Sequence, residues 1–524
     1  MKLLTLKKGN QLIRQQVRNF NFYGNENYNM DFKKVTESQY TVNADGNYKF
    51  AIVGAGPAGF FMARQCLNYI KNAKVDVFER NPHPYGLVRT GMAPDHFQLK
   101  NIEEDFVEVF NDTNRCKFFG NVPVGTEDGI SIEKLKELYS AVILTYGATS
   151  DRKLGLPHEF DYNGVISCRQ MANWYNGSLD HDLDVERDLD LETIQDVAIV
   201  GNGNVAMDIT RILMKKPEVL DKYDIPQEVI NHLKKSKIRN LSLIGRLGAV
   251  QSAFNMKELK EVSKIEDTQL YMFKDELIQS QNEQSIAEIT AGFSPNSANW
   301  ELQFEYLKKS CKLIESEEQF LDIQHTNLGK KNIFLRYLQQ PTELIADPTT
   351  KRIQKVKMQR TQLQGEPGKQ FPVSDPKNLT STLYCQLLIK SIGYQSVAIN
   401  GVPFDDRSFT VPNYRGAVMT LEGKPIPRMF VSGWLKRGPR GITDATLRDA
   451  IETFSMVKHQ VENGFIPEKN TPNEEVIANI PKSHKIVSFE QWKQIDAVER
   501  FVGQHKGKIR EKILQTKEMT QIIK

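Results

Sequence analysis

The sequence predicts an α/β protein with two related parallel-sheet domains. Residues 50–67 contain a short apolar run, a glycine-rich turn and an apolar pattern with helical spacing, and residues 196–214 repeat this order. The two turns carry the spacings G-x-G-x-x-G and G-x-G-x-x-A, which are typical of Rossmann-like dinucleotide-binding units. A chain of 524 residues, 40% of them hydrophobic, is long enough for two or three domains.

The N-terminal part of the chain has the composition of a targeting segment. Residues 1–23 contain five basic side chains and no acidic one, with leucines between them. This is typical of a mitochondrial presequence, and the alternative is a basic N-terminus without a targeting function. Residues 24–45 are mostly polar and predict a poorly ordered lead-in.

The first nucleotide unit occupies residues 50–79 and turns at Gly54-Ala55-Gly56-Pro57-Ala58-Gly59. Its first glycine permits the tight turn, its second lets the backbone approach a pyrophosphate, and its third lets the helix pack close to the strand. The phosphates are then expected at the helix N-terminus. A second strand ends at Glu79, about where a ribose hydroxyl needs an acceptor.

Residues 81–96 are rich in proline and glycine and yet contain many apolar side chains, which predicts a long loop that wraps a ligand. A flavin ring needs an apolar shelf and a few polar contacts, so it is a natural occupant. Asp95 and His96 are candidates for the flavin edge. The alternative for His96 is a hydrogen-bonded structural side chain.

The second nucleotide unit turns at Gly201-Asn202-Gly203-Asn204-Val205-Ala206, and two such units predict two dinucleotides. The next predicted strand, 240–245, ends at Arg246 without an acidic residue at this point. A guanidinium suits the 2′-phosphate of NADP, so NADP is favoured over NAD. The alternative is an arginine that only faces solvent at a strand end.

Further segments complete the predicted fold. Apolar runs at 141–148, 332–337 and 387–394 predict buried strands, and the acidic segment 264–325 predicts a loop-rich insertion. Residues 429–446 predict a strand, a loop and a helix start. In this segment Gly441 is expected to place a helix N-terminus against the flavin pyrimidine, with Trp434 as an aromatic wall, and the alternative for Gly441 is a simple helix cap.

Global composition excludes several classes of protein. The net charge is +4, from 69 basic and 65 acidic residues, which gives no general attraction to nucleic acid. No apolar run has the length of a membrane span. The five cysteines lie far apart without a C-x-x-C pair, which argues against a disulfide framework, a zinc site, a redox dithiol or an intrinsic iron–sulfur centre.

Several motifs resemble one family, the mitochondrial NADPH:adrenodoxin (ferredoxin) oxidoreductases, within the disulfide-reductase-like flavoproteins that have two dinucleotide domains. These motifs are Gly86-Leu87-Val88-Arg89 with Ala93-Pro94-Asp95-His96, the segment from Val200 to Asp208, Lys257-Glu258-Leu259, and the segment from Gly433 to Pro439. The resemblance covers most of the chain from about residue 50. It implies a discontinuous FAD-binding domain at 46–150 and 391–524, and an NADPH-binding domain at 151–390.

The resemblance and the fingerprints together give two sets of expected cofactor contacts. For FAD they are Gly54, Gly56, Ala58, Gly59, Glu79, Leu87, Val124, Trp434, Gly441, Ile442 and Thr443. For NADPH they are Gly201, Asn202, Gly203, Asn204, Val205, Arg246, Glu258 and Gly441. No metal ligand is expected. No catalytic side chain beyond the two candidates at the flavin edge is expected either, since the cofactors carry the chemistry.

The resemblance implies hydride transfer from NADPH to FAD, and then single-electron transfer to a ferredoxin-type [2Fe–2S] protein. The implied location is the mitochondrial matrix, or peripheral on the inner membrane. The chain departs from the family at two places: Arg246-Leu247 stands where the family has an arginine pair, and residues 299–305, with two glutamates, stand where it has a basic run. The alternative function is therefore a flavoprotein-derived structural or accessory subunit of a larger mitochondrial, respiratory assembly.

The cations that remain near the expected flavin end are Lys436, Arg437 and Arg440. If they point to solvent, they partly substitute for the missing basic run as a docking surface for an acidic ferredoxin. The alternative is an ordinary solvated face.

Overall fold

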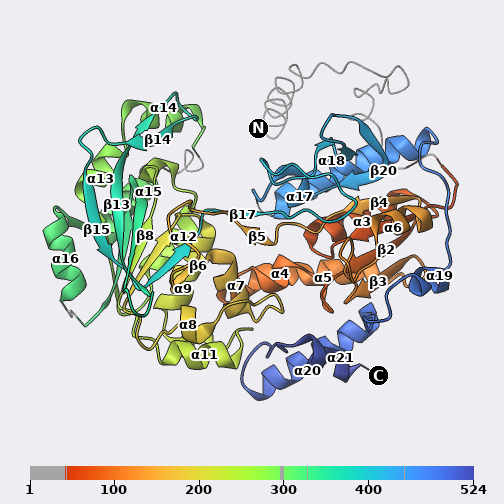
Figure 1. Cartoon of the computed structure of the whole chain (residues 1–524), viewed down its shortest axis with the longest axis horizontal. Helices are drawn as coiled ribbons and strands as arrows, with labels where there is room; N and C mark the ends of the chain where they lie inside the picture. The colour runs from red at the N-terminus through yellow and green to blue at the C-terminus, as the bar shows by residue number, and fades with distance from the viewer. Residues whose placement is uncertain (1–41, 43, 295–299, 327–328, 442, 524) are drawn as a thin grey trace. The chain divides into compact units, whose positions relative to one another are not determined.

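The computed structural model describes residues 42, 44–294, 300–326, 329–441 and 443–523. The expected presequence, almost all of the lead-in at 24–45, and Ile442 lie outside these described residues. Within the described part, two seven-stranded sheets and a smaller antiparallel sheet organise the chain (Figure 1).

The first sheet has the strand order β18-β19-β20-β4-β1-β2-β3 and takes its strands from both ends of the described chain. The strands are β1 (Lys49–Val53), β2 (Lys74–Glu79), β3 (Cys116–Gly120), β4 (Ala141–Leu144), β18 (Asn413–Tyr414), β19 (Ala417–Met419) and β20 (Pro425–Val431). From β20 to β3 the pairing is parallel, which is the order of a Rossmann-like unit with β1 at its centre. Helices α3 (Pro57–Tyr69) and α18 (Thr443–Glu462) pack against each other beside this sheet (Figure 1).

The second sheet is parallel throughout and has the order β10-β9-β11-β8-β7-β16-β6. Its strands are β6 (Val165–Ser167), β7 (Asp196–Val200), β8 (Asn240–Ile244), β9 (Thr268–Phe273), β10 (Cys311–Ile314), β11 (Lys331–Arg336) and β16 (Leu387–Lys390). Helix α9 (Asn204–Met214) packs against α7 (Cys168–Asn176) and α12 (Met256–Ser263). The parallel sheet with its covering helices is therefore a second unit of the same class.

The segment 264–325 is not the loop-rich insertion that its acidity predicts. It supplies strands β9 and β10 of the second sheet and four helices. The helices are α13 (Lys274–Gln279), α14 (Glu283–Ala291), α15 (Trp300–Ser310) and α16 (Glu317–His325). Their inner faces bury side chains such as Leu277, Leu307 and Phe320, while many of their carboxylates face solvent. The charge therefore belongs to the outer faces of amphipathic helices.

The third sheet was not anticipated from the sequence. Strand β13 (Ile353–Gln364) pairs antiparallel with β12 (Gln339–Ala346), β14 (Phe371–Ser374) and β15 (Thr380–Tyr384). The chain passes between the two large sheets twice, at β5 (Ser150–Asp151) and β17 (Tyr394–Gln395), and these strands pair with each other.

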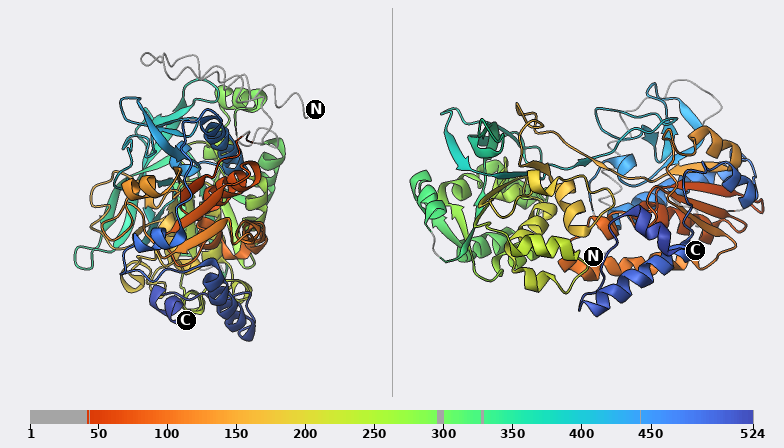
Figure 2. Two further views of the ribbon diagram at one scale, coloured as in Figure 1. Left: turned by 90° about the vertical axis from the view of Figure 1, so that its right-hand side faces the viewer. Right: turned by 60° about the horizontal axis from the view of Figure 1, so that its bottom comes forward.

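Short helical turns and the C-terminal helices complete the described chain. The expected loop 81–96 contains the short helix α4 (Leu87–Thr90) and the start of the 3-10 helix η2 (Pro94–Asn101). The C-terminal helix α20 (Phe489–His505) contacts β3 and α21 (Thr516–Ile522), and Figure 2 shows these helices from two further sides. The other helices are α5 (Ile102–Val107), η3 (Glu108–Phe110), α6 (Ile132–Leu138), α8 (Val185–Asp188), α10 (Pro217–Leu220), α11 (Gln227–Lys234), η4 (Ala249–Gln251), α17 (Trp434–Arg437) and α19 (Asn473–Ala478).

Candidate functional site

The first glycine turn is shaped so that only part of it tolerates a side chain. Gly54 has a φ of +107°, and a Cβ there would lie 2.7 Å from the carbonyl oxygen of Thr145. A Cβ on Gly59 would lie 2.1 Å from the carbonyl oxygen of Gly54. In contrast, the nearest atom to a Cβ on Gly56 is 4.0 Å away, in Gly86. The turn is therefore tight at both ends and open in the middle, where a phosphate group would approach the backbone.

Helix α3 begins at this turn with an N-terminus that the described residues do not cap. Its N-cap is Gly56 in an extended conformation, no side chain accepts a hydrogen bond from the first turn, and no acidic residue lies in that turn. The amide N–H groups of a first helical turn have no intrahelical acceptor, and the helix dipole adds partial positive charge there. This end of α3 is suited to a diphosphate.

Glu79 is held beside the same turn at the end of β2. Its two carboxylate oxygens accept hydrogen bonds from the amides of Ala55, at 2.9 Å, and Asn81, at 3.1 Å. Burial raises the pKa of Glu79, and these two amides oppose the rise. Each carboxylate oxygen has a further lone pair and can accept one more hydrogen bond.

The structure brings several other expected FAD contacts to this region. A Cβ on Gly433 would lie 2.7 Å from the Cβ of Ala58, so the start of α17 lies directly against α3. Trp434 is half-buried, and its ring centroid lies 5.8 Å from that of Tyr394 in β17. Leu87 is half-buried at the start of α4.

Three other expected FAD contacts lie in separate segments. Val124 is buried in the loop after β3 and pairs with Ile130. Gly441 is exposed with a φ of +78°, and Thr443 is the first residue of α18. Ile442 is outside the described residues.

The second glycine turn repeats the design of the first. Gly201 has a φ of +110°, and a Cβ there would lie 2.0 Å from the carbonyl oxygen of Ser391. The nearest atom to a Cβ on Gly203 is 3.9 Å away, in Ala253. Helix α9 starts after Gly203 without a side-chain cap or an acidic residue in its first turn. A second diphosphate fits this helix start for the same physical reasons as the first.

Two expected NADPH contacts carry buried oxygen atoms without a partner. Asn204 Oδ1 and Glu258 Oε2 accept no hydrogen bond from any residue that the structure describes. Glu258 is fixed near the start of α12, whose N-cap Asn255 accepts from the amides of Lys257 and Glu258. An unpaired buried acceptor is costly, so these atoms fit a ligand with N–H or O–H donors, as the carboxamide and ribose of a nicotinamide nucleotide have.

Arg246 extends from the end of β8 with an exposed side chain. Its backbone carbonyl accepts from Thr361 Oγ1 at 2.8 Å, while its guanidinium forms no ion pair within the ranges described. The neighbouring Leu247 is half-buried, and its carbonyl accepts from the amide of Leu338. A single arginine is thus available for a phosphate at this strand end.

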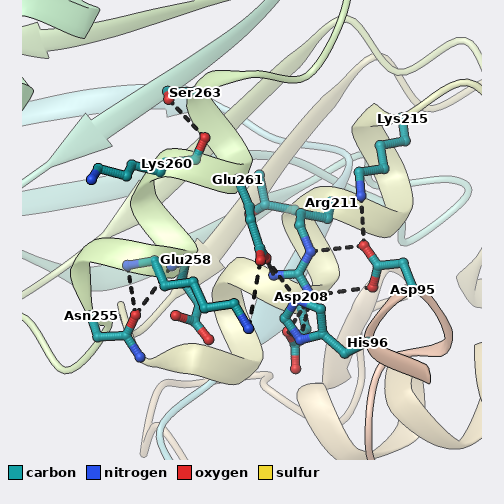
Figure 3. Close-up of polar contacts among 12 residues, drawn as sticks. Asp95, His96, Asp208, Arg211, Lys215, Asn255, Glu258, Lys260, Glu261 and Ser263 are labelled. Atoms are coloured by element: carbon teal, nitrogen blue, oxygen red, sulfur yellow. Dashed lines mark hydrogen bonds and ion pairs between the residues drawn. The ribbon is translucent and has the colours of Figure 1, made fainter. Parts of the chain in front are cut away.

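Asp95 and His96 belong to a buried charged cluster around Arg211 (Figure 3). Arg211 lies in α9 with a fully buried side chain. Its Nε donates to Asp95 Oδ2 at 2.8 Å, and its Nη2 contacts Asp208 Oδ1 at 2.6 Å and His96 Nδ1 at 3.2 Å. Burial acts to raise the pKa of Asp95, but Arg211 outweighs it and the pKa falls to about 2.

The hydrogen bonds of the cluster indicate which ring nitrogen of His96 is the donor and which is the acceptor. Because Arg211 donates to Nδ1, this nitrogen is the acceptor and Nε2 carries the proton. His96 Nε2 lies 2.6 Å from Glu261 Oε2, which accepts that proton's hydrogen bond. Both ring nitrogens are therefore engaged, as the structural alternative for His96 predicts. Lys215 adds a second cation, with its Nζ 2.7 Å from Asp95 Oδ2.

Sequence reasoning did not single out Arg211 or Glu261. The available signal was weak: a charged residue in a helix whose neighbouring side chains Ile209, Ile212 and Leu213 are apolar and buried. A buried charge on an apolar helix face requires a partner from another element, which here is the segment containing Asp95 and His96.

Lys436 does not point to solvent, so the condition for its part in a docking surface is not met. Its side chain is 7% exposed, because the ammonium pairs with Asp449 at 3.1 Å and Glu452 at 2.7 Å, both on α18. Arg437 is half-buried and donates to Thr446 Oγ1. Of the three cations, Arg440 has an exposed side chain.

Other chemistries find little support in the described part of the chain. No group of His, Cys, Asp and Glu there is arranged to hold a metal ion. No described helix combines the length and the apolarity that crossing a membrane requires. All five cysteines are buried without forming a disulfide, and burial raises the pKa of their thiols. A reactive dithiol is therefore not present in this structure.

Comparison with known proteins adds independent findings. Residues 48–236 match the family described as pyridine nucleotide-disulphide oxidoreductase. The chain is 33% identical to the mitochondrial NADPH:adrenodoxin oxidoreductase of Mus musculus over 480 residues, covering 91% of each protein. It is 34% identical to the Arabidopsis thaliana protein of the same name, covering 88% of this chain and 92% of the relative.

A solved structure agrees with these relatives. The structure of Mycobacterium tuberculosis FprA in complex with NADPH matches with a TM-score of 0.77 and 30% identity. The match covers 91% of this chain and 99% of FprA. The similarity therefore extends over both large sheets rather than over one nucleotide unit alone.

Proposed function

The chain belongs to the NADPH:adrenodoxin oxidoreductase family, and we therefore propose that it is an FAD-dependent NADPH:ferredoxin oxidoreductase. When bound, NADPH supplies a hydride, which FAD accepts and passes on as single electrons. The observation that carries the proposal is the pair of uncapped helix starts, at α3 and α9, each behind a glycine turn that is tight at its first glycine and open at its second.

We assign FAD to the region of the first sheet, residues 46–150 and 391–524. The amides at the start of α3 bind its diphosphate, and Glu79 accepts from its ribose hydroxyls. Ala58, Leu87 and Trp434 provide apolar surface for the ring system. The contact between the start of α17 and α3 supports this assignment, since it brings the segment with Trp434 to the phosphate turn.

We assign NADPH to the region of the second sheet, residues 151–390. The amides at the start of α9 bind its diphosphate, and Arg246 meets the 2′-phosphate. The unpaired oxygens of Asn204 and Glu258 accept from its nicotinamide half. Because Leu247 supplies no charge, the preference for NADPH over NADH rests on one guanidinium.

We propose a ferredoxin-type iron–sulfur protein as the electron acceptor. Relatives named as adrenodoxin and ferredoxin reductases support it. The described chain provides no thiol pair that would accept electrons instead. Arg440, three residues after the end of α17, has an exposed side chain and would meet an acidic partner, whereas α15 presents Glu301 and Glu305.

We further propose that the protein acts in the mitochondrial matrix. The eukaryotic relatives from mouse and Arabidopsis thaliana are named as mitochondrial. The acid-free basic segment 1–23 has the composition of a mitochondrial presequence and supports the same location. The alternative, an accessory subunit of a larger assembly without turnover, draws on the same two departures from the family at Leu247 and α15.

Anaerobic reduction of the flavin tests the proposed function. Purified protein is expected to be yellow, and stoichiometric NADPH is expected to remove the visible absorbance of the oxidised flavin. NADH at the same concentration should act more slowly. Colourless protein that binds no added FAD, or flavin that neither nucleotide reduces, would favour the accessory subunit.

A further inference from the structure

The segment 506–514, which we call the C-terminal strap, follows α20 in an irregular conformation and carries alternating basic residues. The side chains of Lys508, Arg510 and Lys512 are 0%, 6% and 1% exposed. Buried cations persist only where carboxylates and carbonyl groups compensate for the lost hydration. The partners of these three side chains come from the regions of both large sheets.

On one side the strap is bound to the connection between α10 and α11, next to the second sheet. Lys508 Nζ donates to the carbonyl of Ile225 at 2.8 Å. The amide of Ile509 donates to the carbonyl of Lys222 at 3.1 Å, and Glu511 Oε1 accepts from the amide of Gln227 at 2.9 Å. The contact of Ile509 joins two backbone groups, so it fixes the path of the strap at this point.

On the other side the strap is bound to α20 and to α4 by a buried carboxylate. Glu499 of α20 accepts from Arg510 Nη1 at 2.9 Å, from Arg89 Nη2 at 2.6 Å and from the amide of Ile513 at 3.0 Å. Arg89 belongs to α4, directly after Leu87 and Val88. Burial acts to raise the pKa of Glu499, but Arg89 and Arg510 outweigh it and the pKa falls to about 2.

The Nζ atom of Lys512 contacts residues from the regions of both large sheets. It donates to the carbonyl of Asn176, at the end of α7, at 2.8 Å, and to the carbonyl of Arg89 in α4 at 3.2 Å. It also lies 3.0 Å from Asp224 Oδ2. Lys100, near the C-terminal end of η2, donates from its Nζ to the same oxygen, Asp224 Oδ2, at 2.7 Å. A single ammonium thus links the segment 87–101 to α7, which packs on α9.

The segment 87–101 is consequently held to the second-sheet region at both of its ends. Lys512 contacts Arg89, and Asp224 contacts Lys100. Between them, Asp95 pairs with Arg211 of α9 and with Lys215, the residue directly after α9. This segment begins with Leu87, an assigned FAD contact, and α9 begins at the assigned NADPH diphosphate site. The strap therefore connects α4, which begins at an assigned FAD contact, with α7, which packs on the helix α9 of the assigned NADPH site.

We propose that Lys512 is a positioning residue that, through the C-terminal strap, sets the alignment of the flavin site with the nicotinamide site. The proposal rests on the proposed function, because it concerns the geometry of hydride transfer between the two assigned cofactors. Such transfer depends steeply on alignment, and a displacement of about 1 Å at a reacting centre can cost roughly a hundredfold in rate. Affinity for each cofactor depends mainly on contacts outside the strap, at the two glycine turns, Glu79 and Arg246.

The test compares Lys512→Met with Lys506→Met. Methionine keeps much of the length of the side chain and removes the ammonium. Lys506 lies in the same strap, but its side chain is 43% exposed and its ion pair with Glu511 is 3.5 Å long. Asp224→Asn is the second variant, which removes the shared carboxylate while keeping its shape, and it applies if Lys512→Met does not fold.

Two measurements are made on protein with FAD bound. The first is the rate of anaerobic flavin reduction against NADPH concentration, at a temperature well below unfolding. The second is hydrogen exchange of the amides at 89–92, which donate to carbonyls at Gly86 and Leu87. Lys512→Met is expected to lower the rate at saturating NADPH by roughly tenfold or more with the half-saturating concentration within about threefold of wild type. It should also accelerate exchange at 89–92, while Lys506→Met changes neither.

A merely stabilising strap gives a different pattern. In that case Lys512→Met lowers the unfolding temperature, but the saturating rate stays within twofold of wild type, and this outcome overturns the proposal. A slower rate without faster exchange at 89–92 overturns it as well, because the effect would not pass through α4. If wild-type flavin is not reduced by NADPH, the proposed function fails instead, and the exchange comparison still shows whether Lys512 holds α4.

Discussion

Replacement of Glu79 is expected to weaken FAD binding without removing the nucleotide fold. In Glu79→Ala the ribose loses a charged acceptor, and the amides of Ala55 and Asn81 lose the carboxylate that they contact at 2.9 and 3.1 Å. One hydrogen bond to a charged group contributes about 1.5–3 kcal/mol. The dissociation constant for FAD should therefore rise roughly tenfold to a hundredfold.

The assay is a titration of FAD into apoprotein, followed by quenching of flavin fluorescence. Glu79→Gln serves as the isosteric variant, because it keeps one acceptor oxygen and should lose less affinity than Glu79→Ala. Glu127→Ala is the matched control, since this carboxylate is exposed in the loop after β3. The unfolding midpoint of each apoprotein separates loss of the two amide contacts from loss of the ribose contact. Unchanged affinity in a folded Glu79→Ala protein would refute the assignment of Glu79 to the ribose.

Three further predictions use the same logic. Arg246→Ala should reduce the preference for NADPH over NADH by roughly tenfold to a hundredfold, and Leu247→Arg should increase this preference. Steady-state rates with each nucleotide measure the preference of each variant. Equal rates with NADPH and NADH in the wild type would contradict the contact between Arg246 and the 2′-phosphate. Arg440→Glu should slow the reduction of an acidic ferredoxin and weaken the salt dependence of that reaction, while NADPH-driven flavin reduction is unchanged. A rate of ferredoxin reduction equal to that of the wild type would exclude Arg440 from the docking surface. The pKa of Glu499 is lowered from 4.5 to about 2, so its ion pairs stabilise the fold fully above pH 4.5 and lose about 3 kcal/mol of that stabilisation as the pH falls toward 2. Urea unfolding at several pH values should show this loss in the wild type, whereas Glu499→Gln should be less stable at neutral pH and lose less on acidification. Equal pH dependence of stability in both proteins would contradict the prediction.

The parts of the fold that the sequence predicted are those with strong local signals. The glycine turns after β1 and β7 require backbone conformations and close approaches that few other residues allow, as the positions of Gly54 and Gly201 show. The strands next to these turns are buried apolar runs and were recognisable for that reason. The match to FprA over both sheets confirms the fold class of two Rossmann-like units.

The parts that were missed depend on partners far away in the chain. Strand β13 alternates buried and exposed side chains irregularly, so the third sheet gave no clear strand pattern. The acidity of 264–325 was misleading because net charge does not distinguish a loop from the solvent face of a helix. The burial of Lys436 was not foreseeable, because its partners Asp449 and Glu452 lie in the next helix along the chain.

The same limit applies to the site. The assigned nucleotide contacts follow from the two glycine fingerprints and from the family resemblance, and they stay predictions. Arg211 and Asp95 are 116 residues apart, and Lys512 and Arg89 are 423 apart, so neither connection has a local signature. Ion pairs that join distant segments become visible only when the fold brings their elements together.

The most direct test of the central claim is one anaerobic stopped-flow experiment with the yellow protein, NADPH and an oxidised [2Fe–2S] ferredoxin from mitochondria. The proposed function predicts that the flavin is reduced first and that the ferredoxin absorbance then falls in step with flavin reoxidation, two ferredoxins for each NADPH. This stoichiometry follows because a hydride carries two electrons and the acceptor takes one. Flavin that NADPH reduces but that transfers no electrons to the ferredoxin at any salt concentration would contradict it.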